Sequence, residues 1–366
     1  MRLPPLSRDV WRRSSRQRIL VRTRPVTGGR RDGEDGMTTT PWNVLALAPL
    51  DEGIVRGLFA PLGDAVRVSF PPSRDRAGLH TAIAGADVVV SDFSGQLALD
   101  AEAVGLASRL AFVQLPQVGS DNVDLEALTQ AGVPVANTAG VNARAVAEWA
   151  VGAAFSLCRS LAWADRAIRA GGWPQMETLV RGGRELHTQR VGIVGYGAIG
   201  SEAARLFSAL GCPVSYWTRR RRPEAPATYR ELDDLLAHSD ILVIALPLTD
   251  ETRNLLDDAK LALLPPKALV INVARAGIVP EDSLLAALDS GHLAGAALDV
   301  FEDEPPALDH PLRTHESVLL SPHAAWATAQ AQINSAVVIQ DNVKAAVEGR
   351  PVRNVINGLP PKIERR

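Results

Sequence analysis

The chain has 366 residues, of which 46% are hydrophobic, and its formal net charge is −2 at pH 7. One hydrophobic core of ordinary size does not accommodate this length, so we expect two domains. A charge so close to neutrality argues against nucleic acid as the main partner. The two cysteines are too few for a disulfide scaffold and lack the spacing of metal ligands, which predicts a reducing, cytoplasmic location and no metal site.

Residues 1–36 differ in composition from the rest of the chain. They hold ten arginines against four acidic residues, a net charge of +6 that leaves −8 for the remainder, and they show no apolar periodicity. We predict a disordered leader over residues 1–41. The alternatives are an organellar transit peptide and a natural start at Met37.

Short apolar runs rich in β-branched residues then alternate with helical patterns. The first series of predicted strands covers residues 43–48, 65–70, 86–90, 110–115 and 133–136. Strands separated by helices of about 10 to 15 residues predict parallel β-α-β units.

Residues 143–170 form a long helical pattern that is apolar on more than one face and contains Trp149, Phe155 and Trp163. Such a helix is usually buried, either as a spine between domains or in a dimer interface. Its most apolar part, residues 149–158, is far shorter than the roughly 20 residues that span a bilayer, so we predict no membrane partner.

A Gly-x-Gly-x-x-Gly pattern at Gly195, Gly197 and Gly200 follows an apolar strand pattern and precedes a helical one. In this setting the pattern is typical of a dinucleotide-binding turn. Gly195 permits the tight turn, Gly197 lets the backbone approach a pyrophosphate, and Gly200 lets the helix pack on the strand. The helix N-terminus offers free amides to the phosphates. An ordinary glycine-rich turn is the alternative.

The next predicted strand, residues 213–218, ends where an acidic residue would bind the ribose of NAD. Thr218, Arg219 and Arg220 stand there instead, followed by two further arginines. A guanidinium can grip a 2′-phosphate with two hydrogen bonds. We therefore predict NADP(H) as the preferred cofactor, with NAD(H) as the alternative if the arginines form only a solvated patch.

Later predicted strands cover residues 241–246, 269–273, 294–300 and 318–320, and three charged groups follow strand ends. They are Arg275, Glu304 and His323. His323 would exchange a proton with a substrate oxygen, Glu304 would orient and stabilise the imidazolium, and Arg275 would bind a substrate carboxylate. Together they suit hydride transfer beside a nicotinamide.

From about residue 44 to 357 the chain resembles the D-isomer-specific 2-hydroxyacid dehydrogenase family. The resemblance rests on the glycine pattern and on the segments 272–277, 299–305, 322–323 and 349–355. It implies that Arg275, Glu304 and His323 are catalytic, that Asp299 contacts the nicotinamide amide, and that the protein is a homodimer through the long helix.

The predicted fold is α/β, with two Rossmann-like doubly wound parallel-sheet domains and a cleft between them. We assign residues 42–140 and 325–358 to a flavodoxin-like substrate domain and residues 141–324 to the dinucleotide-binding domain. The predicted cofactor-binding residues are Gly195, Gly197, Ala198, Ile199, Gly200, Thr218, Arg219, Arg220, Leu246, Pro247, Val273, Ala274 and Asp299.

The predicted substrate residues are Ser94, Gly95, Val118, Gly119 and Arg275, the first four through backbone amides. Two glycines of the family pattern are absent: Ala276 replaces the first of the two that follow the arginine, and the loop over residues 114–122 lacks a second glycine. Asp92 would repel a phosphate, which disfavours phosphoglycerate, and Glu304 stands where formate dehydrogenases have glutamine.

We therefore expect an oxidoreductase that reduces a small 2-keto acid, of the glyoxylate or hydroxypyruvate reductase kind. One alternative is a reductase of bulky aryl or alkyl 2-keto acids, whose pocket Phe93 and Trp326 would line as readily. The other is a non-catalytic dinucleotide-sensing protein with the same fold.

Overall fold

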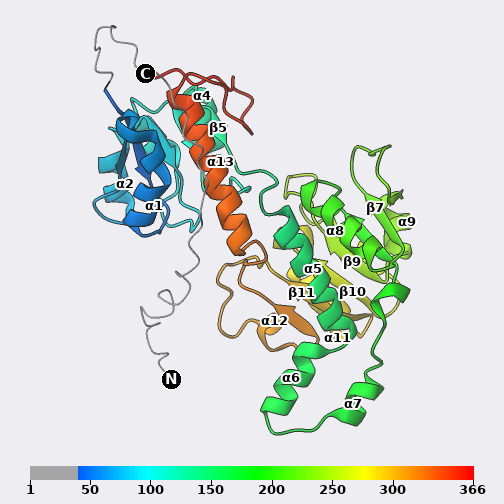
Figure 1. The fold of residues 1–366 in the computed structure, drawn as a ribbon. Coiled ribbons are helices and arrows are strands. Elements are labelled where there is room, and N and C mark those ends of the chain that lie inside the picture. Colours follow the sequence, from blue (N-terminus) through cyan, green and yellow to red (C-terminus); the bar gives the residue numbers. More distant parts are fainter. Residues whose placement is uncertain (1–39) are drawn as a thin grey trace, which may run out of the picture. The chain divides into compact units, whose positions relative to one another are not determined.

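The computed structural model describes residues 40–366, and these residues contain two parallel β-sheets (Figure 1). Met37 and nearly all of the predicted leader lie outside the described residues. The two sheets confirm the α/β fold predicted from the alternation of strands and helices.

The first sheet has five strands in the order β2-β1-β3-β4-β5, and every neighbouring pair is parallel. This is the flavodoxin-type order, in which the strand order reverses between β1 and β3. The strands are β1 (Trp42–Ala46), β2 (Val66–Ser69), β3 (Val88–Val90), β4 (Phe112–Gln114) and β5 (Val135–Ala136).

Aspartates begin the four short helices that connect these strands. Asp51, Asp75, Asp100 and Asp124 each accept hydrogen bonds from amides of the first helical turn, which satisfies donors that have no partner inside the helix. The helices are α1 (Glu52–Phe59), α2 (Arg76–Ile83), α3 (Ala101–Leu106) and α4 (Leu125–Gln130), and a 3₁₀ helix, η1 (Ala60–Ala65), follows α1.

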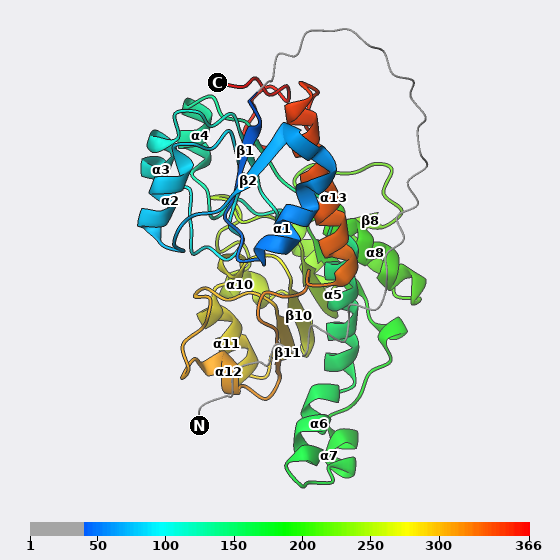
Figure 2. The same cartoon turned by 60° about the vertical axis from the view of Figure 1, so that its left-hand side comes forward.

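The last helix, α13 (Ala329–Val347), packs against α1 and β4 of the first sheet (Figures 1 and 2). A buried polar contact attaches it there, because Asn342 Nδ2 donates to Gln114 Oε1 at 2.8 Å. The Asn342 side chain also binds both polar groups of the Arg353 backbone. The C-terminal chain therefore belongs with strands that precede it by more than two hundred residues.

The second sheet has seven parallel strands in the order β12-β11-β10-β9-β6-β7-β8. Its order reverses between β6 and β9, as in dinucleotide-binding sheets. The strands are β6 (Val191–Val194), β7 (Val214–Trp217), β8 (Thr228–Tyr229), β9 (Ile241–Ile244), β10 (Ala268–Asn272), β11 (Leu293–Leu298) and β12 (Val318–Leu320). Strand β8 is absent from the prediction because two residues carry no detectable alternation.

Helices cover both faces of the second sheet. Side chains of α5 and α8 share one apolar cluster with it, and those of α9, α10 and α11 share the other. The bounds are α5 (Ala143–Cys158), α8 (Ala198–Ala209), α9 (Leu232–Ala237), α10 (Asp258–Leu261), α11 (Glu281–Asp289) and α12 (Pro311–Thr314), with 3₁₀ helices η2 (Leu186–Thr188) and η3 (Ala276–Ile278).

The prediction of a single long helix over residues 143–170 is wrong. The structure has α5 and a separate α6 (Leu161–Arg169), because Ser160 takes a left-handed conformation with φ of 51° between them. Helix α5 is buried against α8, whereas α6 has no buried residue. Helix α7 (Gln175–Val180) follows, and it too is exposed. None of the helices in residues 40–366 combines the length and apolarity needed to cross a membrane.

Candidate active site

The glycine turn lies between β6 and α8. A Cβ atom on Gly195 would lie 2.5 Å from the Ala245 carbonyl oxygen, and one on Gly200 would lie 1.9 Å from that of Gly195. Both positions therefore exclude any side chain, and Gly195 also has φ of 100°. A Cβ on Gly197 would meet no atom within 4 Å. The turn thus combines close helix packing with open space where a pyrophosphate would lie.

The first turn of α8 is open to a phosphate. Gly197 is its N-cap residue and supplies no side-chain cap, so the amides of the following residues, including Ala198 and Ile199, are available. Leu246, Val273 and Ala274 follow β9 and β10 beside the turn and are at most 9% exposed, while Pro247 is exposed. These residues fit a dinucleotide.

The arginines predicted to bind the ribose phosphate lie at the end of β7, beside the glycine turn. The Gly195 amide donates to the Trp217 carbonyl at 2.8 Å, which brings Thr218 and Arg219 close to it. Arg219 is 59% exposed, and its one ion pair among residues 40–366 is with Glu251, at 3.5 Å. Arg220 forms no ion pair with any residue from 40 to 366. Both guanidinium groups are free to reach a ligand.

The structure brings Glu304 and His323 together. The imidazole Nδ1 lies 2.7 Å from Glu304 Oε2, and each side chain is 38% exposed. Glu304 Oε1 accepts a hydrogen bond from the Phe301 amide at 3.2 Å, so the carboxylate is itself oriented. With a carboxylate at Nδ1, Nε2 is left for a ligand, and it makes no hydrogen bond within the described chain.

Asp299 anchors the loop that carries His323. Its side chain accepts hydrogen bonds from the Ala324 amide at 2.8 Å, the Ala325 amide at 2.9 Å and the Ser321 hydroxyl, and it is 2% exposed. The His323 amide donates to the Asp299 carbonyl at 2.8 Å. This holds His323 at φ of 50°, which is uncommon for a residue with a side chain. Contact of Asp299 with nicotinamide stays a prediction.

Arg275 follows β10 and reaches a loop of the first sheet. Its Nη2 donates to Asp121 Oδ2 at 2.9 Å, and its Nη1 donates to the Ala274 carbonyl at 2.8 Å. Asn272 fixes the turn by bonding both the Ala274 amide and the Arg275 carbonyl. A Cβ on Gly119 would lie 2.4 Å from Arg275 Nη2, so only glycine lets the guanidinium lie there.

Asp121 was not predicted as a site residue. Burial raises its pKa, but the hydrogen bond and charge of Arg275 outweigh burial, and the charge of His323 adds to them, so the pKa lies below its ordinary value. The charges of Arg275 and His323 thus both act on the Asp121 carboxylate. The available signal was its place two residues after Gly119, in the segment that resembles the family's glycine-rich loop.

The backbone amides predicted to bind substrate are only partly available. Those of Gly95, Val118 and Gly119 make no hydrogen bond to any residue from 40 to 366. The Ser94 amide, in contrast, donates to Asp92 Oδ1 at 2.8 Å and is not available as predicted. Asp92 is fully buried and pairs with Arg74 at 2.8 Å, so the argument that its charge repels a phosphate is wrong.

Comparison with known proteins agrees with this geometry. Residues 151–325 match the family model described as the D-isomer specific 2-hydroxyacid dehydrogenase, NAD binding domain. A glyoxylate reductase of Aeropyrum pernix is 39% identical over 267 residues, which cover 71% of this chain and 80% of that protein. A D-3-phosphoglycerate dehydrogenase of Archaeoglobus fulgidus is 34% identical over 266 residues, 72% of this chain but only 50% of that longer protein.

Among solved structures, the TT0316 protein from Thermus thermophilus has a TM-score of 0.76 and 30% identity, covering 86% of this chain and 99% of that one. The similarity therefore includes both sheets and the segments that carry Arg275, Glu304 and His323.

Proposed function

The chain belongs to the D-isomer-specific 2-hydroxyacid dehydrogenase family, and from this premise we propose that it reduces a short 2-keto acid, such as glyoxylate or hydroxypyruvate, with NADPH as the preferred reductant. The contact that carries the proposal is the one between His323 Nδ1 and Glu304 Oε2, with Arg275 and Asp121 nearby. A protein that only sensed a dinucleotide would not need an oriented imidazole with a free nitrogen.

In this proposal His323 acts as the general acid. Glu304 accepts a hydrogen bond from Nδ1 and orients the ring, so that Nε2 is the nitrogen that gives its proton to the carbonyl oxygen of the substrate. A reduced nicotinamide dinucleotide held at the glycine turn of Gly195, Gly197 and Gly200 would supply the hydride for the carbonyl carbon. The product is the 2-hydroxy acid, whose new hydroxyl proton comes from His323. In the oxidation direction the neutral imidazole takes that proton back.

Arg275 binds the substrate carboxylate, and the open amides of Gly95, Val118 and Gly119 add donors around it. A guanidinium forms two parallel hydrogen bonds with a carboxylate and so fixes its orientation. This places the adjacent carbonyl at a defined angle to His323, which is the geometric part of the rate enhancement.

The proposed preference for NADPH rests on Arg219 and Arg220. The partner of Arg219 is the exposed Glu251 at 3.5 Å, and an exposed pair of this kind contributes little energy. If Arg219 releases Glu251 and binds the ribose 2′-phosphate of NADPH instead, the binding free energy of the cofactor therefore improves.

We test the proposal by initial rates of NADPH and NADH oxidation with glyoxylate, hydroxypyruvate, phenylpyruvate and 3-phosphohydroxypyruvate. Fast NADPH oxidation with the two small acids is the expected result. A preference for phenylpyruvate or for the phosphorylated acid would contradict the proposed substrate class. Tight binding of NADPH without turnover of any acid would instead support a sensing protein.

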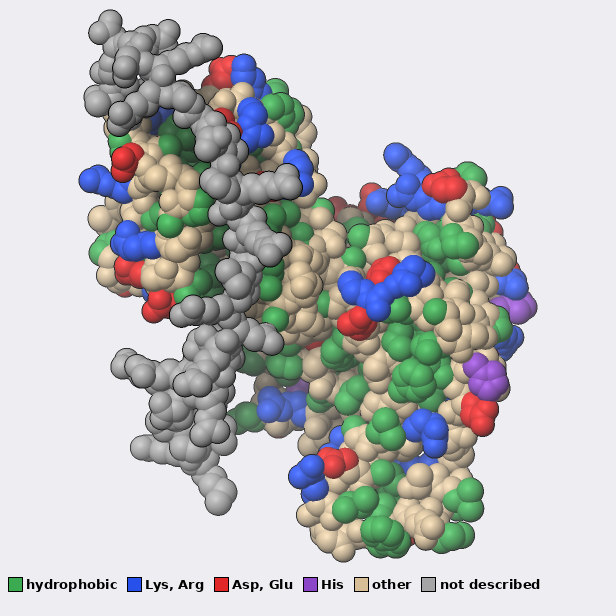
Figure 3. Space-filling view, in the orientation of Figure 1, with side chains coloured by type: hydrophobic (Ala, Val, Ile, Leu, Met, Phe, Trp, Pro, Cys, Tyr) green, Lys and Arg blue, Asp and Glu red, His purple; other side chains and the backbone are tan. Residues whose placement is uncertain are grey.

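We also propose that the protein is a homodimer through α6 and α7. These helices carry several large exposed apolar side chains, and Figure 3 shows such side chains gathered at the lower end of the molecule. Apolar clusters of this kind mark interaction surfaces. The side chains are Leu161 and Ile168 on α6, Met176, Leu179 and Val180 on α7, and Trp173 between the two helices, each more than half exposed.

A further inference from the structure

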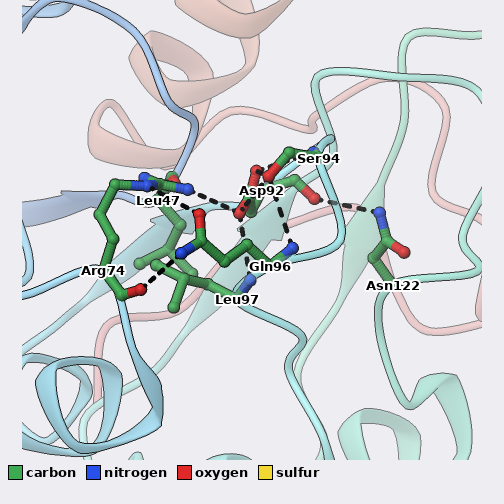
Figure 4. A network of polar contacts seen from close by, with 7 residues as sticks. All are labelled: Leu47, Arg74, Asp92, Ser94, Gln96, Leu97 and Asn122. Carbon is green, nitrogen blue, oxygen red and sulfur yellow. Dashed lines mark hydrogen bonds and ion pairs between the residues drawn. The ribbon is translucent and has the colours of Figure 1, made fainter. Parts of the chain in front are cut away.

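A buried carboxylate organises the loop that follows β3 (Figure 4). Asp92 is fully buried, and its oxygens accept hydrogen bonds from the Ser94 amide at 2.8 Å, the Ser94 hydroxyl at 2.7 Å and the Leu97 amide at 3.1 Å. The carboxylate thus folds residues 92–97 around itself. A buried charge of this kind needs a counter-charge.

Arg74 supplies that counter-charge from the segment between β2 and α2. Its Nη2 donates to Asp92 Oδ2 at 2.8 Å, and its Nη1 donates to the Leu47 carbonyl, directly after β1, at 2.7 Å. Gln96 binds Arg74 from the loop itself, because its Nε2 donates to the Arg74 main-chain carbonyl at 2.7 Å and its Oε1 accepts a hydrogen bond from Arg74 Nε at 3.4 Å. The guanidinium is held on several sides, so it is a fixed support and not a mobile surface charge.

The loop supported by Arg74 reaches the predicted catalytic residues. The Phe93 ring lies edge to face with Trp326, with ring centroids 6.3 Å apart, and the Trp326 indole donates to the His323 carbonyl at 3.0 Å. On the other side, the Asp92 carbonyl accepts a hydrogen bond from Asn122 at 3.2 Å, next to Asp121. The position of the loop therefore affects the surroundings of both His323 and Arg275.

We propose that Arg74 is a positioning residue for substrate selection, an inference that rests on the proposed reductase activity. Through Asp92 it holds Phe93 against Trp326, and this ring pair limits the side chain of an accepted 2-keto acid to a small group. Arg74 is placed to act through Asp92, because Asp92, Leu47 and Gln96 each accept a hydrogen bond from its guanidinium.

Loss of Arg74 leaves a buried carboxylate without a counter-charge, and the loop must then move so that Asp92 reaches solvent. Lysine restores the charge but cannot bind Asp92 and Leu47 with a rigid planar group. We therefore expect Arg74→Lys to recover part of what Arg74→Met loses.

The test compares the variants Arg74→Met and Arg74→Lys, and the control variant Arg76→Met, with the wild-type protein. Every variant is made in the whole 366-residue chain. Arg76 lies two residues away and pairs with the exposed Asp100 and Glu102. The readouts are KM and kcat for glyoxylate and phenylpyruvate, the Kd for NADPH by fluorescence, and thermal unfolding.

For Arg74→Met we expect KM for glyoxylate to rise about tenfold with a smaller change in kcat. The ratio of kcat/KM between glyoxylate and phenylpyruvate should fall about tenfold, in the range that pocket shape controls. The Kd for NADPH should stay within twofold of wild type, Arg74→Lys should be intermediate, and Arg76→Met should match wild type.

An unchanged ratio in a folded Arg74→Met protein overturns the inference, as does a loss confined to 3-phosphohydroxypyruvate, which would make Arg74 a direct phosphate contact. If Arg74→Met does not fold, Phe93→Ala tests the same step, since it should lower the ratio without disturbing Asp92. Wild-type protein that turns over no 2-keto acid would refute the proposed function itself, and this is seen before any variant is made.

Discussion

At His323 the two imidazole nitrogens differ in their contacts with the chain. Nδ1 is held by Glu304, and Nε2 has no partner within residues 40–366. The loop is fixed by Asp299, so the ring has a defined direction even though it is partly exposed.

We expect His323→Ala to lower kcat by about 10²- to 10⁴-fold, because the proton donor is lost. The Kd for NADPH should be nearly unchanged, since the glycine turn lies on other elements. Steady-state kinetics and fluorescence titration measure the two quantities. His187→Ala removes an exposed histidine and serves as the control. Loss of activity and cofactor binding together would indicate a structural role for His323.

Arg219→Asp should shift the preference from NADPH toward NADH. One charge-assisted hydrogen bond contributes about 1.5 to 3 kcal/mol, so we expect a change of about ten- to a hundredfold in the ratio of kcat/KM values. Arg221→Asp makes the same charge change at an arginine that lies over Tyr229, and its effect should be much smaller. Equal effects of the two substitutions would show that the arginines act on cofactor preference through their overall charge and that Arg219 makes no specific contact with the phosphate.

The sequence predicts candidate site residues that local motifs mark, but not those that are defined by distant contacts. Arg275, Glu304 and His323 each lie in a short recognisable segment. Asp121 pairs with a residue 154 positions away, and Arg74 lies in a segment without a motif. Ser94 was placed in the right loop, yet its amide is engaged because the turn around Asp92 is not visible in the sequence.

Among the elements, strands were predictable because parallel sheets buried on both faces require continuous apolar runs. One strand was not predicted and one helix prediction is wrong, and in both places the apolar pattern of the sequence carries no information. Strand β8 is too short for periodicity, and the break at Ser160 interrupts a sequence that remains helical in composition on both sides. Helix starts were better marked, since aspartate caps are local signals.

Helices α5 and α8 are joined by an ion pair whose contribution to stability depends measurably on pH. Glu202 on α8 bonds Arg205 on the same helix and Arg144 on α5, at 2.8 Å each. The hydrogen bond from Arg205, followed by that from Arg144, lowers the pKa of Glu202 from 4.5 to about 2. A lowered carboxyl pKa means that the folded state favours the ionised form.

We expect Glu202→Gln to lower the free energy of unfolding by about 1 kcal/mol at pH 7, a value reduced for the partial exposure of the pair. The stabilisation from Glu202 is complete above pH 4.5 and declines as the pH falls toward about 2. Urea unfolding at pH 7 and pH 3 should show the difference shrinking in acid. Glu224→Gln, at a residue without an ion pair in the described chain, should show no such trend.

For the whole molecule, the exposed apolar side chains of α6 and α7 predict association. Val180 is 84% exposed in the single chain, and Val180→Glu would place a charge inside the proposed dimer contact. We expect sedimentation velocity to show a dimer for wild type and a shift toward monomer for this variant. Leu308→Glu changes an equally exposed apolar side chain, 87% exposed, outside α6 and α7, and should remain dimeric. A wild-type monomer would contradict the proposal.

The contact between Arg275 and Asp121 gives substrate binding a particular character. The guanidinium already holds a carboxylate of the chain itself, and the hydrogen bond and charge of Arg275 lower the pKa of Asp121 below its ordinary value. Under the proposed binding mode, a 2-keto acid that reached Arg275 would exchange one anion for another. A simple carboxylate such as acetate would also have to displace Asp121 from Arg275, but it has no carbonyl oxygen that could bind His323. We therefore expect a ligand with a second point of attachment, such as a 2-keto acid, to displace Asp121 more readily than a simple carboxylate does.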